Sequence, residues 1–166
     1  DPDWFDYAGL PALLREADPG RQRALQVRGA NPFEVYCWMT GLEEAMVNLV
    51  TNPDLVRAGL ERITAFELVR LQRVLEAIGP QVDLVFMADD LGGQTGLLMS
   101  RETYRAVIQP YHRLFVESCR DLAPRARVIF HTDGAVFDII PDLIDAGIDV
   151  LEAVQTDAAG MVPEQL

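Results

Sequence analysis

Short apolar runs alternate with helical segments along this chain, and the alternation predicts an α/β fold. The helical segments place apolar residues three and four positions apart, whereas the apolar runs are short enough to be buried strands. Strands are expected at 24–29, 82–88, 127–131 and 148–154. Helices are expected at 6–17, 33–51, 53–78 and 100–122, with one more ending at 146. Strands separated by helices pair in parallel through right-handed crossovers, so we expect one parallel sheet.

Two of the helical segments carry distinctive features. Apolar residues from Leu42 to Val50 recur at helical spacing and form one stripe, which is typical of the side of a helix that packs against a core. Pro110 lies inside the helix expected at 100–122. A proline there removes a backbone hydrogen bond, so we expect a kink or a break at this position.

Polar side chains follow three of the predicted strands at the point where each apolar run stops. These side chains are Asp89 and Asp90 after the first run, His131 and Asp133 after the second, and Glu152 and Gln155 after the third. In α/β enzymes the strands are buried and their carboxyl ends carry the chemistry. The pattern therefore predicts an enzyme, with its site at this edge of the sheet.

Asp89 and Asp90 are candidate catalytic residues. Adjacent residues on a strand point to opposite faces, so only one of the two can face a given pocket. A carboxylate in that position could act as a general acid or base, bind a metal or stabilise a developing cation. The alternative is that one aspartate accepts hydrogen bonds from backbone amides of the following loop, a common role of aspartate in turns.

His131 and Asp133 are candidate metal ligands, and His131 is also a candidate catalytic base. The two residues are two positions apart, so in an extended conformation both side chains point the same way. One nitrogen and one oxygen ligand suit zinc or another divalent ion if a third ligand comes from elsewhere. Without a metal, Asp133 could orient a histidine base. The alternative is a structural histidine that binds the backbone of a neighbouring strand.

Three further residues are candidate substrate contacts. Gln94 lies in the glycine-containing loop after 82–88, and Glu152 and Gln155 follow the last strand. Gln155 could also bind a metal-bound water, and a solvated loop is the alternative for both residues after the last strand. We interpret His112, which lies in a helical segment, as a surface or packing residue.

Length and charge exclude some classes of protein. The chain has 166 residues, enough for one core, and a net charge of −12, which disfavours nucleic acid and anionic membranes as partners. No apolar stretch approaches the roughly 20 residues of a membrane helix. Two isolated cysteines indicate a reducing, cytoplasmic setting. Because the first residue is not methionine, we expect the chain to begin inside a longer protein.

The order of several short motifs resembles the uroporphyrinogen decarboxylase superfamily, which includes the decarboxylase itself and corrinoid-linked methyltransferases. The motifs follow one another in the family's order from about residue 33 to 161. They are Phe33-Glu34, Leu42-Glu43-Glu44, Asn52-Pro53-Asp54-Leu55-Val56, the segment from Asp89 to Gln94 with Ser100, Pro110-Tyr111-His112, His131-Thr132-Asp133-Gly134, the segment from Pro141 to Ile144, the segment from Ala146 to Asp149, and Val154-Gln155.

The resemblance implies a (β/α)8 TIM barrel, of which residues 1–166 would form a single partial domain from the central portion. In the methyltransferase branch a zinc site includes a His-x-Cys pair, and His131-x-Asp133 stands at the matching place with oxygen instead of sulfur. The remaining ligand would lie beyond Leu166. This branch implies a corrinoid as methyl carrier, and a corrinoid protein as partner. Half of a barrel leaves strand edges unpaired, so we expect no stable monomer. A homo-oligomer is one alternative.

Three functions follow from the resemblance. The first is metal-assisted methyl transfer, with His131 and Asp133 on the metal and Asp89 or Asp90 positioning the methyl donor. The second is decarboxylation of uroporphyrinogen without metal or cofactor, in which an aspartate stabilises a protonated pyrrole. That tetrapyrrole carries eight carboxylates, and the strand ends offer only Arg28. The third is a binding barrel that kept the fold without the chemistry.

Overall fold

The four strands form one parallel sheet in the order of the chain, as the alternating pattern predicts. The structure is a computed structural model that describes all of residues 1–166. The strands are β1 (Gln26–Arg28), β2 (Leu84–Ala88), β3 (Arg127–His131) and β4 (Val150–Glu152), and each pairs with the next. β1 and β4 are therefore the two edges of the sheet. The expectation that the chain is not a stable monomer stays a prediction.

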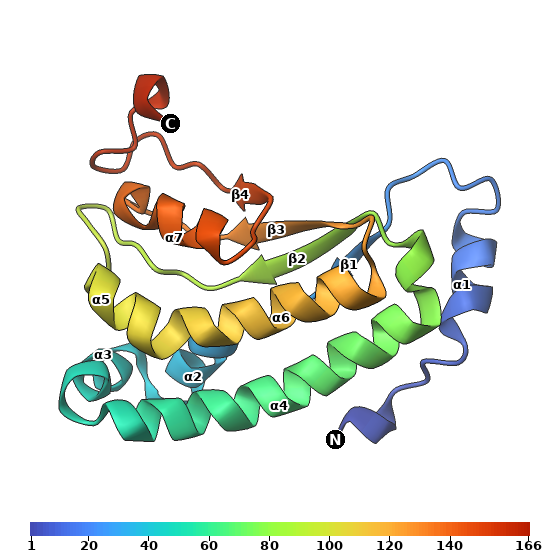
Figure 1. Cartoon of the computed structure of the whole chain (residues 1–166), viewed down its shortest axis with the longest axis horizontal. Coiled ribbons are helices and arrows are strands. Elements are labelled where there is room, and N and C mark those ends of the chain that lie inside the picture. Colours follow the sequence, from blue (N-terminus) through green and yellow to red (C-terminus); the bar gives the residue numbers. More distant parts are fainter.

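One helix precedes the sheet, and further helices follow each of the first three strands. They are α1 (Leu10–Ala17), α2 (Pro32–Thr40), α3 (Leu42–Thr51), α4 (Pro53–Ile78), α5 (Arg101–Thr103), α6 (Gln109–Leu122) and α7 (Ile140–Asp145), joined by the π-helical turn η3 (Tyr104–Ile108) and by 3-10 turns at Pro2–Trp4 (η1), Gly79–Gln81 (η2), Phe137–Ile139 (η4) and Pro163–Gln165 (η5). The long helices α4 and α6 contact each other and run side by side along the sheet (Figure 1). None of the helices has the length and apolar character needed to cross a membrane.

The two faces of the sheet differ in their surroundings. Val85 and Met87 of β2, like Val128 and Phe130 of β3, are buried in the core under the helices. The alternate residues of the same strands point to the opposite face, because side chains alternate along a strand. That face is open and lines a cavity of about 540 Å³, which reaches from Gln26 on β1 across the sheet to Glu152 on β4. The helices thus cover one face and leave the other to the site.

The break at Pro110 is confirmed. The α-helical hydrogen bonding gives way to the π-helical turn η3, and α6 begins with Pro110 in its second position. Proline has no N–H group for the bond to the carbonyl four residues earlier, and it fits the first turn of a helix, where that bond is not needed. Ser100 caps the short helix α5, because its side chain accepts a hydrogen bond from the Thr103 amide.

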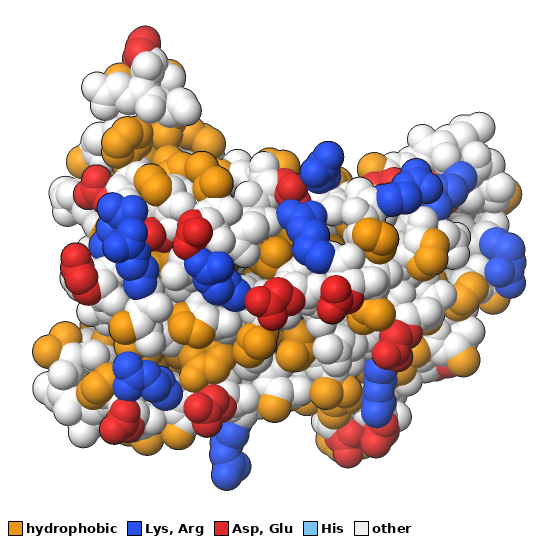
Figure 2. Space-filling view, in the orientation of Figure 1, with side chains coloured by type: hydrophobic (Ala, Val, Ile, Leu, Met, Phe, Trp, Pro, Cys, Tyr) orange, Lys and Arg blue, Asp and Glu red, His pale blue; other side chains and the backbone are white.

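The apolar stripe from Leu42 to Val50 is narrower than expected. Ala45 and Leu49 are buried, but Leu42 is 54% exposed and Val50 is 80% exposed. α3 packs mainly against α2 and α4, and these two helices cover one side of it. Elsewhere, the outer face formed by α4 and α6 shows acidic and basic side chains interspersed (Figure 2), which is typical of a solvated helical layer.

Candidate functional site

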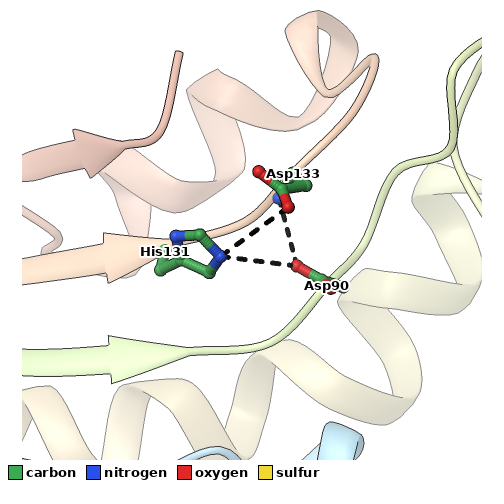
Figure 3. A group of neighbouring side chains, drawn as sticks. All are labelled: Asp90, His131 and Asp133. Atoms are coloured by element: carbon green, nitrogen blue, oxygen red, sulfur yellow. Dashed lines mark hydrogen bonds and ion pairs between the residues drawn. The ribbon is translucent and has the colours of Figure 1, made fainter. Parts of the chain in front are cut away.

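Three side chains converge beyond the carboxyl ends of β2 and β3. They are Asp90, His131 and Asp133, whose potential ligand atoms all lie within 4.8 Å of one another. The Nε2 atom of His131 lies 3.8 Å from an Asp90 oxygen and 4.0 Å from an Asp133 oxygen. Figure 3 shows the imidazole at the end of its strand with both carboxylates turned toward it. His131 and Asp133 share one side of the sheet edge, as their spacing predicts.

The strand register brings the three residues together. Ala88 pairs with His131, and the Asp89 amide donates to the His131 carbonyl at 3.1 Å, so the next residue of each chain leaves the sheet at the same level. An oxygen of Asp90 then accepts a hydrogen bond from the Asp133 amide at 3.1 Å. The two segments after the strands are therefore joined directly at the site.

Glu152 fixes the orientation of His131. β4 pairs with β3 so that Glu152 is the register partner of His131, and its carboxylate lies 2.7 Å from Nδ1. The carboxylate accepts the Nδ1 proton, which leaves Nε2 facing Asp90 and Asp133. Histidines that bind metals generally donate their other N–H group to a carboxylate, a carbonyl or water in this way. The sequence suggested Glu152 as a substrate contact, whereas the structure places it against His131 at the edge of the cavity.

Two of the three spacings among the ligand atoms, those to His131 Nε2, come near the value that one metal ion requires. Zinc binds imidazole nitrogen and carboxylate oxygen at about 2.0–2.2 Å, so ligand atoms on one tetrahedral ion lie roughly 3.3 Å apart. The gaps of 3.8 and 4.0 Å exceed this by less than 1 Å. The side chains of Asp90 and Asp133 are about half exposed, and small rotations of such carboxylates close these gaps.

Gln155 holds the loop that carries Asp133. Its side-chain oxygen accepts a hydrogen bond from the Gly134 amide at 2.9 Å. Gly134 has a φ of +85°, a conformation that favours glycine. A β-carbon there would also lie 2.5 Å from the Gly92 backbone. Gln155 thus shapes the site through the backbone, and the structure shows no separate contact surface for it.

Gln94 lies apart from the three converging residues. Its side chain is exposed, and it lines neither the cavity over the sheet nor the smaller one beside Asp90. Its carbonyl accepts a hydrogen bond from the Ala159 amide at 2.9 Å, so its backbone ties the loop after β2 to the C-terminal segment.

Asp89 is buried and points away from the cavity, which corrects its place among the candidate catalytic residues. Its carboxylate accepts hydrogen bonds from the amides of Phe33 at 3.2 Å and Glu34 at 2.7 Å. It therefore caps the N-terminus of α2 in place of Asn31, whose side chain makes no cap bond. Burial raises the pKa of Asp89, and the bond to His112 and the two amides oppose that rise. As expected, only one of the adjacent aspartates reaches the open site.

His112 is fully buried, so its interpretation as a surface residue is wrong and its packing role is confirmed. Nε2 lies 2.7 Å from an Asp89 oxygen, and Nδ1 lies 3.1 Å from the Tyr104 hydroxyl. All three side chains are 0% exposed. The His112 ring also lies beside Phe130, with centroids 4.9 Å apart. The group links η3 and α6 to the end of β2.

Glu34 is a site residue that the sequence reasoning missed. It lines the cavity over the sheet together with His131, and it also lines the smaller cavity beside Asp90. The Asn31 side chain donates to its carboxylate at 2.8 Å. The signal was available, because Glu34 lies in the first turn of the helix after β1 and so at the same edge as the other strand ends.

The site is strongly acidic. Asp90, Asp133, Glu152 and Glu34 surround His131, and Arg28 is the basic residue of the cavity lining. Such a set of carboxylates attracts cations and repels anions.

The comparisons with known proteins agree with the order of motifs. The model of the family described as Uroporphyrinogen decarboxylase (URO-D) matches residues 13–159. No curated protein and no solved structure matches the chain. The family match covers β1 to β4 and every residue of the converging group, and the chain belongs to the uroporphyrinogen decarboxylase family.

Proposed function

We propose that this chain forms part of a (β/α)8 barrel enzyme that transfers a methyl group with the help of a divalent metal, zinc, and a corrinoid methyl carrier. The observation that supports the metal is the position of His131, with Nε2 facing Asp90 and Asp133 and Nδ1 held by Glu152. The family match supports the barrel, of which residues 1–166 would be one partial domain.

Asp90, His131 and Asp133 would hold the metal and leave one tetrahedral position open. When bound, zinc supplies Lewis acidity toward a substrate heteroatom in that position. The ligand set has carboxylate oxygen in place of the thiolate of the family's His-x-Cys pair. It is therefore a harder set of ligands than that pair provides. Of the two roles suggested for His131, metal ligand and catalytic base, this proposal takes that of ligand.

The other residues of the site prepare this arrangement. Glu152 keeps the Nδ1 proton on His131, and Gln155 holds the backbone on which Asp133 stands. Glu34, His131 and Glu152 line the end of the 540 Å³ cavity at the carboxyl edge of the strands, where a small molecule would reach the open position. A corrinoid protein would be the partner and would approach the same edge of the sheet. The free cysteines Cys37 and Cys119 fit a reducing cytoplasm.

The charge of the site favours this proposal over decarboxylation of uroporphyrinogen. The cavity lining that includes Arg28 also includes two carboxylates, Glu34 and Glu152, and Asp90 and Asp133 lie beside it. A substrate with eight carboxylates would meet repulsion there rather than recognition. The same acidic groups are suited to a metal ion.

Zinc binding by the purified protein tests the proposal. Isothermal titration should give one zinc per chain, and His131→Ala or Asp133→Asn should lower the affinity by about 100-fold or more, because each removes a direct ligand. Asp138→Asn is the matched control, since Asp138 is an exposed aspartate five residues along the chain. Equal zinc affinity in Asp133→Asn and Asp138→Asn would overturn the assignment, and turnover of uroporphyrinogen by metal-free protein would favour the decarboxylase.

A further inference from the structure

A second cavity lies on the other side of Asp90, and its lining is mixed in a specific way. It has a volume of about 400 Å³, within the range of small-molecule sites. Its apolar walls come from α2, the start of α3 and the loop after β2. These walls are Phe33, Cys37, Trp38, Leu42 and Leu98, and the acidic members of the lining are Glu34 and Asp90.

Two of the apolar wall residues are available to a ligand. Trp38 is 65% exposed and Leu42 is 54% exposed, so neither is used by the core. Burial raises the pKa of Cys37 to about 12, so its thiol stays neutral and adds to the apolar wall. An apolar body that entered the cavity would cover these side chains, which is favourable in proportion to the area removed from water.

The polar groups of the cavity are both acceptors with negative charge. Glu34 is held at 2.8 Å by the Asn31 side chain, which fixes the carboxylate at the wall without neutralising it. The cavity lining contains no Lys or Arg. An indole beside two carboxylates attracts a cation, because the face of the ring and the oxygens favour the same sign of charge.

We propose that this cavity binds a small organic amine in its protonated form, with the apolar body between Trp38 and Leu42 and the ammonium group on Glu34. Glu34 lines both cavities, so an amine placed there lies next to the Asp90–His131–Asp133 group. That the amine is the substrate of the metal centre rests on the proposed function, whereas its binding does not.

Fluorescence of Trp38 measures this binding. The only other tryptophan, Trp4, is 84% exposed on η1 and can be replaced by phenylalanine so that the signal reports on the cavity alone. Three probes of similar shape separate charge from apolar contact: benzylamine, benzyl alcohol and phenylacetate. We expect saturable binding of benzylamine, binding of benzyl alcohol that is about tenfold weaker, and no binding of phenylacetate.

Glu34→Gln should reduce the affinity for benzylamine to that for benzyl alcohol. Glutamine keeps the side-chain oxygen that accepts from Asn31, so the variant retains the local fold. Glu44→Gln is the matched control, because Glu44 accepts from the Asn48 side chain at 3.0 Å in the same manner but outside the cavity. Equal binding of benzylamine and benzyl alcohol, or unchanged benzylamine binding in Glu34→Gln, would overturn the proposal.

His131→Ala and a chelator separate this proposal from the metal assignment. If zinc is lost while benzylamine still binds, the cavity stands without the metal. If the wild-type protein binds zinc but benzylamine has no effect on Trp38, the amine site fails and the metal assignment is untouched.

Discussion

The two histidines of this chain lie among carboxylates in contrasting ways. His112 is 0% exposed and has one partner on each nitrogen, Asp89 and Tyr104. The His131 side chain is 29% exposed and faces three carboxylates, of which only Glu152 is within hydrogen-bond distance. A buried polar group with every partner in place stabilises the fold. It also has no hydrogen-bonding capacity left for a ligand. A partly exposed imidazole whose Nε2 has carboxylates just beyond hydrogen-bond distance leaves room for an ion.

The adjacent aspartates repeat the same contrast one residue apart. Asp89 satisfies the N-terminus of α2 and the ring of His112, while Asp90 has one backbone donor and stands at the wall of a cavity. The buried aspartate also supports the site, because Asp89 anchors the N-terminus of α2, which carries Glu34. Stability and binding should therefore respond to different substitutions.

The largest expected effect is on stability. His112→Ala should lower the free energy of unfolding by about 3–5 kcal/mol, because it leaves the buried Asp89 carboxylate without its side-chain partner. His131→Ala should change it by less than about 1 kcal/mol, since pairs near the surface contribute little. Chemical denaturation of both variants checks the contrast, and equal losses would remove it.

Glu67 tests the cost of burial without a full set of partners. Burial raises the pKa of Glu67, on α4, to about 7. One hydrogen bond, donated by the backbone N–H of Asn31 to the carboxylate, opposes that rise. The folded state therefore keeps a proton that the unfolded chain releases near pH 4.5, so stability is full below pH 4.5 and falls by about 3 kcal/mol as the pH rises to 7. Glu67→Gln should remove this fall, so that the variant is the more stable protein at pH 8. Denaturation curves at pH 5 and pH 8 that change in parallel for both proteins would argue against it.

Glu152 sharpens the account of His131. Glu152→Gln should weaken zinc binding by about 10–100-fold and leave the fold intact, because the amide no longer fixes the Nδ1 proton as a carboxylate does. Glu164→Gln, at an exposed position in η5, is the control and should bind zinc as the wild type does. If the two variants bind equally well, Glu152 does not support the ligand.

The smallest effect belongs to a fully exposed carboxylate. The Asp54 side chain is 97% exposed in its pair with Arg57. Asp54→Asn should change stability by less than about 1 kcal/mol, with a difference that shrinks as salt is added. Thermal unfolding at low and high ionic strength measures this limit, and a loss comparable to that of His112→Ala would show that exposure is not what separates the two kinds of carboxylate.

Much of the fold could be predicted from local pattern. The four strands and their parallel pairing follow from apolar runs between helical segments, and the break at Pro110 follows from the missing N–H group. The ends of the elements were predicted less accurately, since the strand expected at 148–154 is observed at Val150–Glu152. Ends of elements depend on contacts with neighbours, which the local sequence does not contain.

The candidate site was only partly accessible in this way. The spacing of His131 and Asp133 predicts that they share a side, and the rule for adjacent residues predicts that one aspartate turns away. Which aspartate turns inward was decided by α2, whose unpaired amides needed an acceptor. His112 carries no local signal for its role, because its partners lie 8 and 23 residues away.

The sequence by itself determined the kinds of residue that end each strand, and therefore that acidic groups and one imidazole gather at one edge of a parallel sheet. Only the tertiary structure decided which of them are satisfied and which are free. The strand register sets the 2.7 Å hydrogen bond between Glu152 and His131. Asp89 is buried away from solvent, whereas Asp90 is partly exposed. The physical reason is that hydrogen-bond satisfaction depends on distances between elements far apart in the chain, whereas patterning acts within each element.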